Sequence, residues 1–170
     1  EVFAEVPTPA TSLDRAVGPD RNVALIRSSV DLVKQIAHAH HAKVNDVLLV
    51  VTAGGLRGLL RSRGEPVDDL VLPVYVPVTL RPAQLRARAR GNLIGQMIVP
   101  LPIGTFDPVR RLRQIATETG ERKARPHPPL GTVLRGRIAR WAMLKVVDRY
   151  PISVTTADVP EAGTYHVWVR

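Results

Sequence analysis

Hydrophobic positions in this chain repeat with two periods, one typical of helices and one typical of strands. The clearest helical stretch begins at Val44, where apolar residues recur every three or four positions as far as Leu60. Asn45 or Asp46 can cap its start, and Gly64 is placed to end it. The pattern therefore predicts a helix with a broad apolar face between Val44 and Gly64.

Three small residues interrupt this helix: Gly54, Gly55 and Gly58. Each glycine inside a helix costs about 1 kcal/mol relative to alanine. Their clustering predicts a close neighbour for this helix, either another backbone or a ligand.

Three further helices are predicted. A short one follows the cap residues Ser28 and Ser29 and ends near His41. Another starts at Asp107-Pro108 and stops before Pro126. Its apolar stripe is Val109, Leu112, Ile115 and Ala116, and its arginines are expected to point the other way. A last helix is expected over residues 132–148.

Runs of β-branched and apolar residues predict five strands. They cover residues 22–27, 71–79, 92–101, 152–156 and 164–169. Pro73 and Pro77 share one parity within the second strand, so their missing N–H groups would lie on the same side. We therefore expect that strand to lie at an edge or to have a locally open ladder.

Helices and strands are interspersed without a strict strand–helix rhythm. This order predicts the α/β class, with a mixed sheet and helices packed on it. Residues 1–20 are rich in proline, threonine, serine and aspartate, and are interpreted as an extended entry segment or a linker. Residues 21–170 are interpreted as the domain itself.

Composition narrows the possible chemistry. The absence of cysteine excludes disulfides, thiolate metal sites and cysteine nucleophiles. The formal charge of +9 favours anionic partners such as an anionic membrane surface, phosphorylated molecules or nucleic acid. The alternative is that the clustered arginines form ordinary solvated surfaces. Aromatic residues make up only 4%, which argues against nucleic acid. No signal peptide or apolar run of about 20 residues is visible, so a cytoplasmic location is expected.

Histidines cluster before the main helix. Three of them, His38, His40 and His41, precede Asp46 and could suggest a metal site. A metal site, however, needs three ligands that converge on one point, and Asp46 belongs to the next secondary-structure element. We therefore expect a solvated helix end there, and no metal.

An ordered set of short motifs then resembles the bacterial wax ester synthase/diacylglycerol acyltransferase family. The motifs are Thr11–Pro19, Val44–Leu48, Val76–Arg81, Gly91-Asn92, Pro100–Pro102 and Asp107–Leu112. The resemblance covers essentially the whole chain and implies the middle to C-terminal portion of such an enzyme. It implies a chloramphenicol acetyltransferase-like two-layer sandwich, here an incomplete C-terminal subdomain.

The resemblance also implies a function. Family members transfer an acyl group from acyl-CoA to diacylglycerol or a fatty alcohol, with acyl-CoA as substrate and no resident cofactor. Their catalytic His-His-x-x-x-Asp-Gly motif is expected in an N-terminal half, upstream of this chain, so no catalytic residue is assigned here. Substrate-binding positions carried over from the family motifs are Asn45, Asp46, Gly91 and Asn92. The enzyme is expected in the cytoplasm, with contact to membranes or lipid droplets as a further possibility.

Two departures from the family pattern matter. His40-His41-Ala-Lys-Val-Asn45-Asp46 imitates the catalytic motif, but Asn45 and Asp46 stand where aspartate and glycine belong. The segment Thr156–Ala162 replaces a Thr-Asn-Val-Pro-Gly-Pro-like motif and has lost its Gly-Pro. The alternative function is therefore a non-catalytic domain that binds a lipid surface or a partner.

Overall fold

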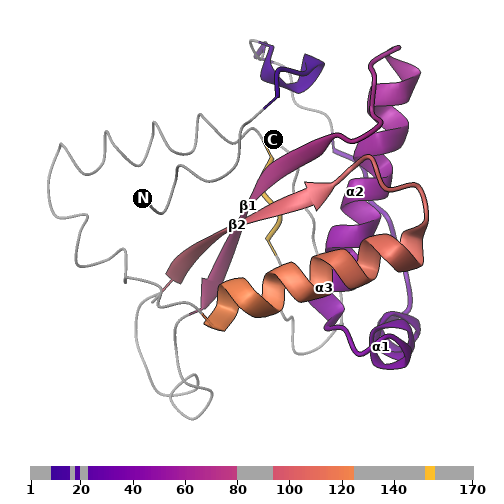
Figure 1. Ribbon diagram of the computed structural model, residues 1–170, viewed down its shortest axis with the longest axis vertical. Helices are drawn as coiled ribbons and strands as arrows, with labels where there is room; N and C mark the ends of the chain where they lie inside the picture. Colours follow the sequence, from indigo (N-terminus) through magenta and orange to yellow (C-terminus); the bar gives the residue numbers. More distant parts are fainter. Residues whose placement is uncertain (1–8, 16–17, 20–22, 80–93, 125–151, 156–170) are drawn as a thin grey trace, which may run out of the picture.

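The computed structural model describes residues 9–15, 18–19, 23–79, 94–124 and 152–155 (Figure 1). Its element order is η1 (Ser12–Asp14), α1 (Val30–Ala39), α2 (Val44–Ser62), β1 (Val71–Thr79), β2 (Ile94–Pro102) and α3 (Pro108–Ala124). The expected helix at 132–148 and strand at 164–169 lie outside the described residues.

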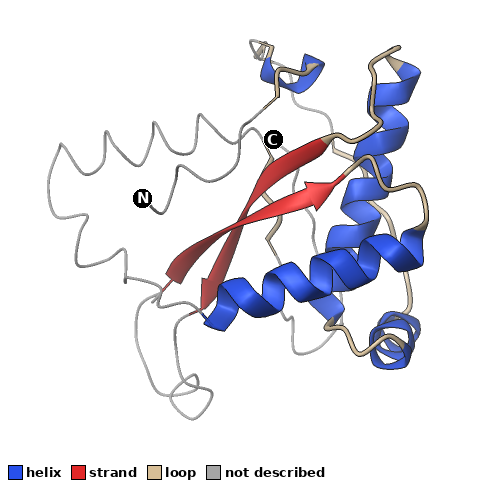
Figure 2. Cartoon of the chain, viewed as in Figure 1, coloured by secondary structure: helices blue, strands red, loops and turns tan. Residues whose placement is uncertain are grey.

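The two strands pair antiparallel, with Val74 opposite Val99 at the centre. One face of this pair is aliphatic, because β1 contributes its even positions and β2 its odd positions to the core. Helices α2 and α3 cover that face, and Leu49, Ala53, Leu60 and Ile115 are completely buried there. Figure 2 shows the helices gathered to one side of the strands.

The prolines of β1 explain how the ladder is built. Tyr75 donates its N–H to Ile152 O at 3.0 Å and accepts from Val154 N at 2.9 Å, forming an isolated parallel bridge at Ser153. Pro73 and Pro77 flank Tyr75 at the same parity, so their missing N–H groups lie on this side, away from β2. Among the described residues, β1 thus has a full ladder on one side only, which agrees with the expected edge strand or locally open ladder. The described sheet is an antiparallel pair with one isolated parallel bridge beside it.

The ends of the two long helices largely agree with their sequence signals. Asp107 Oδ1 accepts from Arg110 N at 2.6 Å at the start of α3, with Pro108 at the first helical position. Gly64 adopts φ 75° after α2, and the N–H groups of Gly64 and Glu65 bond to Arg61 O and Leu60 O. This arrangement is a Schellman motif.

The strand expected at residues 22–27 is not formed by the residues described there. Residues 23–29 carry no regular structure and are exposed, with Ile26 at 85%. Apolar, β-branched composition favours a strand only where a partner strand supplies the hydrogen bonds. No such partner is found in the described part of the chain. No helix described in the structure is long and apolar enough to span a bilayer.

Part of the predicted linker is folded onto the end of α2. Thr11 caps η1, accepting from Leu13 N at 3.2 Å, and Asp14 Oδ2 accepts from Thr11 N at 2.7 Å. Ser12 then joins this turn to the far end of α2 through Arg63 and Glu65. The domain boundary at residue 20 stays a prediction.

Candidate functional site

Asp46 is the centre of the site that the sequence singled out. Its side chain is buried, and Oδ2 accepts from Lys43 N at 2.8 Å while Oδ1 accepts from the Thr119 hydroxyl at 2.7 Å. The N-cap position is taken by Lys43, not by Asn45 or Asp46, but the Asp46 side chain helps to cap the helix by accepting from the Lys43 N–H. Asp46 stands at the third helical position and closes back on the cap, as a capping-box carboxylate does.

This carboxylate therefore links two helices. Thr119 lies on α3, 73 positions further along the chain, and is itself buried. Hydrogen bonds to an ionised acceptor contribute about 1.5–3 kcal/mol, more than neutral ones. With a hydrogen bond on each oxygen, Asp46 orients the start of α2 against α3.

Two lysines lie near the carboxylate. Burial lowers the pKa of Lys123, the nearby charge of Lys43 lowers it further, and the charge of Asp46 opposes the shift. Lys123 follows Thr119 by one helical turn, on the same side of α3. Lys43, Asp46, Thr119 and Lys123 are here called the Asp46 cluster.

Asn45 occupies the position beside Asp46 on α2. Its Oδ1 is buried, and no group in the described ranges donates a hydrogen bond to it. An unpaired buried acceptor of this kind costs about 1–3 kcal/mol. The two neighbouring predicted residues therefore differ: each carboxylate oxygen of Asp46 accepts a hydrogen bond, whereas no described group donates to Asn45 Oδ1.

The other predicted substrate-binding residues, Gly91 and Asn92, lie outside the described residues, and their role stays a prediction. The site residues that the structure can bring together are thus Asn45 and Asp46 alone.

The histidines take no part in the Asp46 cluster. His41 adopts φ 52° directly after α1. Its N–H bonds to His38 O at 3.2 Å and the Ala42 N–H bonds to Ala37 O at 2.8 Å, which forms a second Schellman motif with histidine at the position glycine usually takes. The described residues contain no group of three or more histidine, aspartate or glutamate side chains suited to a metal ion.

Two arginines that sequence reasoning did not assign clamp the loop between β2 and α3. Arg57 Nη1 donates to Ile103 O and Gly104 O, each at 3.0 Å. Arg111 Nε donates to Thr105 O at 3.0 Å. Three consecutive carbonyls of this loop thereby accept hydrogen bonds from side chains of α2 and α3.

The expectation that the arginines of α3 point away from the core was wrong for Arg111. Its side chain is buried, at 4% exposure, and it reaches the face of α2 where Gly54 lies. A Cβ on Gly54 would meet Arg111 Nη1 at 3.0 Å, so this glycine gives the guanidinium its space. Burial lowers the pKa of Arg111, and the charge of Arg57 lowers it further, while Asp107 opposes the shift.

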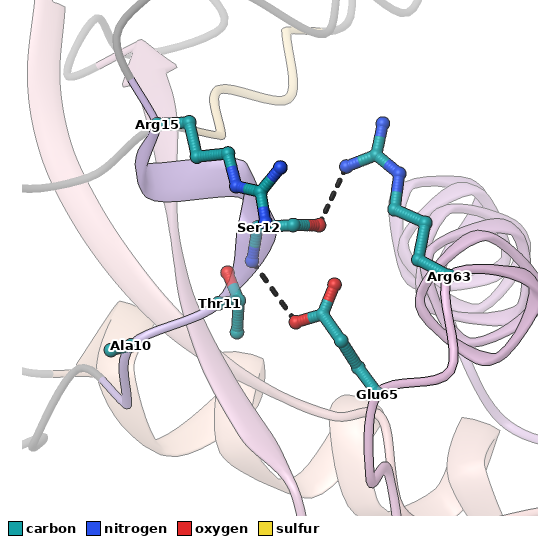
Figure 3. Close-up of a pocket in the computed structure, with 6 residues that line it drawn as sticks. All are labelled: Ala10, Thr11, Ser12, Arg15, Arg63 and Glu65. Carbon is teal, nitrogen blue, oxygen red and sulfur yellow. Dashed lines mark hydrogen bonds between the residues drawn. The ribbon is translucent and has the colours of Figure 1, made fainter.

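A shallow, open depression of about 720 Å³ lies at the other end of α2. Figure 3 shows its lining, in which Ser12 on η1 faces Arg63 and Glu65 and is bonded to both. Arg63 donates to the Ser12 hydroxyl at 2.6 Å, and Glu65 Oε2 accepts from Ser12 N at 3.0 Å. These polar groups hold η1 on the end of α2. The depression is therefore a contact between two parts of the same chain, here called the seam, formed by Ser12, Arg63 and Glu65.

Comparison with known proteins shows what the chain is similar to. Residues 90–160 match the model of the WS/DGAT C-terminal domain. A protein of Mycobacterium tuberculosis named as a diacylglycerol O-acyltransferase is 31% identical over 123 residues, 72% of this chain and 24% of that protein. A second from the same species, also named as a diacylglycerol O-acyltransferase, is 34% identical over 127 residues, 74% of this chain and 28% of that protein.

In these comparisons the chain is similar to the C-terminal portion of wax ester synthase/diacylglycerol acyltransferases. A solved structure, the wax ester synthase/diacylglycerol acyltransferase from Marinobacter aquaeolei VT8, shares its fold with a TM-score of 0.50 and 18% identity. That match covers 75% of this chain and 28% of the Marinobacter chain. The expected chloramphenicol acetyltransferase-like α/β fold is confirmed. The chain spans about a quarter of the length of the curated relatives it matches.

Proposed function

We propose that this chain is the C-terminal portion of an acyl-CoA-dependent O-acyltransferase that makes triacylglycerol or wax esters. The observation that carries the proposal is the match to relatives named as diacylglycerol O-acyltransferases over almost three quarters of the chain. In this proposal the catalytic His-His-x-x-x-Asp-Gly motif lies in polypeptide outside the 170 residues.

The reaction needs a base that this chain does not supply. The base accepts the proton of the acceptor hydroxyl, the oxygen attacks the thioester carbonyl, and the ester forms as the CoA thiolate leaves. His41 is held in the turn after α1, and Asp46 is engaged on both oxygens. These contacts support a positioning role for the chain, in which the Asp46 cluster fixes α2 against α3 and orients the Asn45 amide.

The test uses the polypeptide that source cells make. An antibody against residues 23–79 is used to isolate it, and the isolate is assayed with labelled acyl-CoA and either diacylglycerol or a fatty alcohol. We expect a polypeptide well above 18.6 kDa that forms a labelled neutral lipid. The 170-residue chain alone, assayed in parallel, is expected to form none.

Two results would contradict the proposal. One is an isolate that forms no neutral lipid from acyl-CoA while a relative assayed beside it does. The other is acyl transfer by the 170-residue chain alone that disappears in His41→Ala, which would move the base into this chain.

A further inference from the structure

The outer face of α2, on the side away from the sheet, is apolar and exposed. It consists of the half-buried Val44 and Leu48 and the exposed Val51, Gly55, Gly58 and Leu59, spaced along one side of the helix. Val51 is 60% exposed and Leu59 is 39% exposed. This set of residues is here called the outer face.

Charged side chains do not interrupt this face. Between Val44 and Leu60 the helix carries two charged residues, Asp46 and Arg57. Asp46 is bonded to Thr119, and Arg57 is turned toward the loop at Ile103. A helix that is apolar on all sides is normally buried on all sides. Here the side toward the sheet is buried, and the opposite side is not.

The two glycines give a second, independent indication. A Cβ on Gly55 or Gly58 would meet no described atom within 4 Å, unlike one on Gly54. Each costs about 1 kcal/mol of helix stability relative to alanine, and no packing within the described chain requires the missing side chain. Small residues on an exposed apolar helix face allow another backbone to approach closely.

We propose that the outer face of α2 is the docking surface for the remainder of the acyltransferase. The occupant is argued from length: the relatives are about four times longer than the part this chain matches, so most of such an enzyme is polypeptide outside this chain. A face without charge, with two glycines between aliphatic residues, fits an apolar segment packed against it. This inference rests on the proposed function, because it takes the longer enzyme as the partner.

The test measures how accessible the face is in the chain alone and in the longer polypeptide. The chain contains no cysteine, so Val51→Cys and Thr117→Cys each introduce one reactive thiol. Val51 lies on the outer face, and Thr117 is an exposed control on α3. Maleimide labelling rates are read by mass spectrometry on the peptide that carries each thiol.

We expect both thiols to react at similar rates in the 170-residue chain. In the longer polypeptide, labelling at position 51 should slow by at least about tenfold, while labelling at position 117 stays within about twofold. Equal rates at position 51 in the two forms would overturn the inference. Protection already present in the 170-residue chain would also overturn it, because a second copy or the chain itself would then cover the face.

The labelling is independent of acyl transfer. Slow labelling at position 51 in a longer polypeptide that forms no neutral lipid would support the docking surface and contradict the proposed function. Rapid labelling in a polypeptide that does form neutral lipid would contradict the docking surface and leave the proposed function standing.

Discussion

Adjacent residues on α2 have different physical roles. Asp46 is buried and bonded to Lys43 and Thr119, while the Oδ1 of Asn45 has no donor among the described residues. A sequence motif presents the two as one pair. The two side chains point about 100° apart around the helix. Asp46 therefore links α2 to α3, while Asn45 Oδ1 can accept a hydrogen bond from another group.

The first prediction concerns this link. Thr119→Val preserves the side-chain shape but removes the hydroxyl that donates to Asp46. The buried carboxylate then loses a donor, so the free energy of unfolding should fall by about 1–3 kcal/mol. Urea unfolding followed by circular dichroism measures it.

Thr117→Val is the matched control, because Thr117 is exposed on the same helix. Its free energy of unfolding should change by no more than about 0.5 kcal/mol. Equal losses in the two variants would mean that the bond to Asp46 contributes nothing specific.

Among the secondary-structure elements, the close contact of α2 with α3 depends on Gly54. Arg111 is held by the carbonyls of the loop after β2, so its guanidinium has little freedom to move when a methyl group is added opposite it. The same loop has a second close contact, because a Cβ on Gly104 would lie 2.5 Å from Asp69 N.

A pair of alanine substitutions tests the contact at Gly54. Gly55→Ala should stabilise the chain by up to about 1 kcal/mol, since the helix gains propensity and the added methyl group meets no described atom within 4 Å. Gly54→Ala gains the same propensity but presses on Arg111, so it should be less stable than Gly55→Ala. Thermal unfolding measures the stability of both variants. Equal stabilisation would show that the Arg111 side chain moves aside at no cost in free energy.

The seam between η1 and α2 is expected to depend on pH through Glu65. Hydrogen bonds from Ser12 lower the pKa of Glu65 from its usual 4.5, and the charges of Arg63 and Arg15 add to the shift. A carboxyl whose pKa is lowered by folding stabilises the fold above its unfolded value, and this contribution is lost as the pH falls through the folded value. Stability from this seam is therefore present at neutral pH and lost in acid.

Glu65→Gln tests this dependence, because glutamine still accepts from Ser12 N but does not titrate. Urea midpoints of the wild type and the variant should differ near neutral pH, and the difference should shrink as the pH falls below 4.5. The exposed Glu121→Gln on α3 serves as control. A difference that stays constant with pH would exclude Glu65 as the titrating group.

For the whole molecule, the packing of α2 is one-sided. Its inner side meets the sheet and α3, and Figure 1 shows it standing beside both, whereas its outer face meets solvent in the described structure. If the remainder of the enzyme packs on that face, larger side chains there should reduce acyl transfer by the longer polypeptide. The same side chains should not reduce the stability of the 170-residue chain.

Gly55→Leu combined with Gly58→Leu adds that bulk where no described atom lies within 4 Å of the added Cβ. The 170-residue chain should remain folded and become no less stable, because both changes raise helix propensity. Acyl transfer by the longer polypeptide should fall by about tenfold or more. Gly120→Leu on α3 also adds bulk in open space and should leave transfer within about twofold. Full activity of the double variant would show that nothing packs closely there.

The sequence by itself determined the local elements with clear chemical signals. The Asp107-Pro108 start of α3, the Gly64 end of α2 and the proline-flanked Tyr75 in β1 follow from groups that bond within a few residues or lack an N–H. Only the tertiary structure decided that Asp46 meets Thr119, that Arg111 lies inside, and that residues 23–29 find no strand partner in the described part. These outcomes depend on groups far apart in the chain, and the free energy of burying or pairing a side chain is set by the partner that folding brings to it.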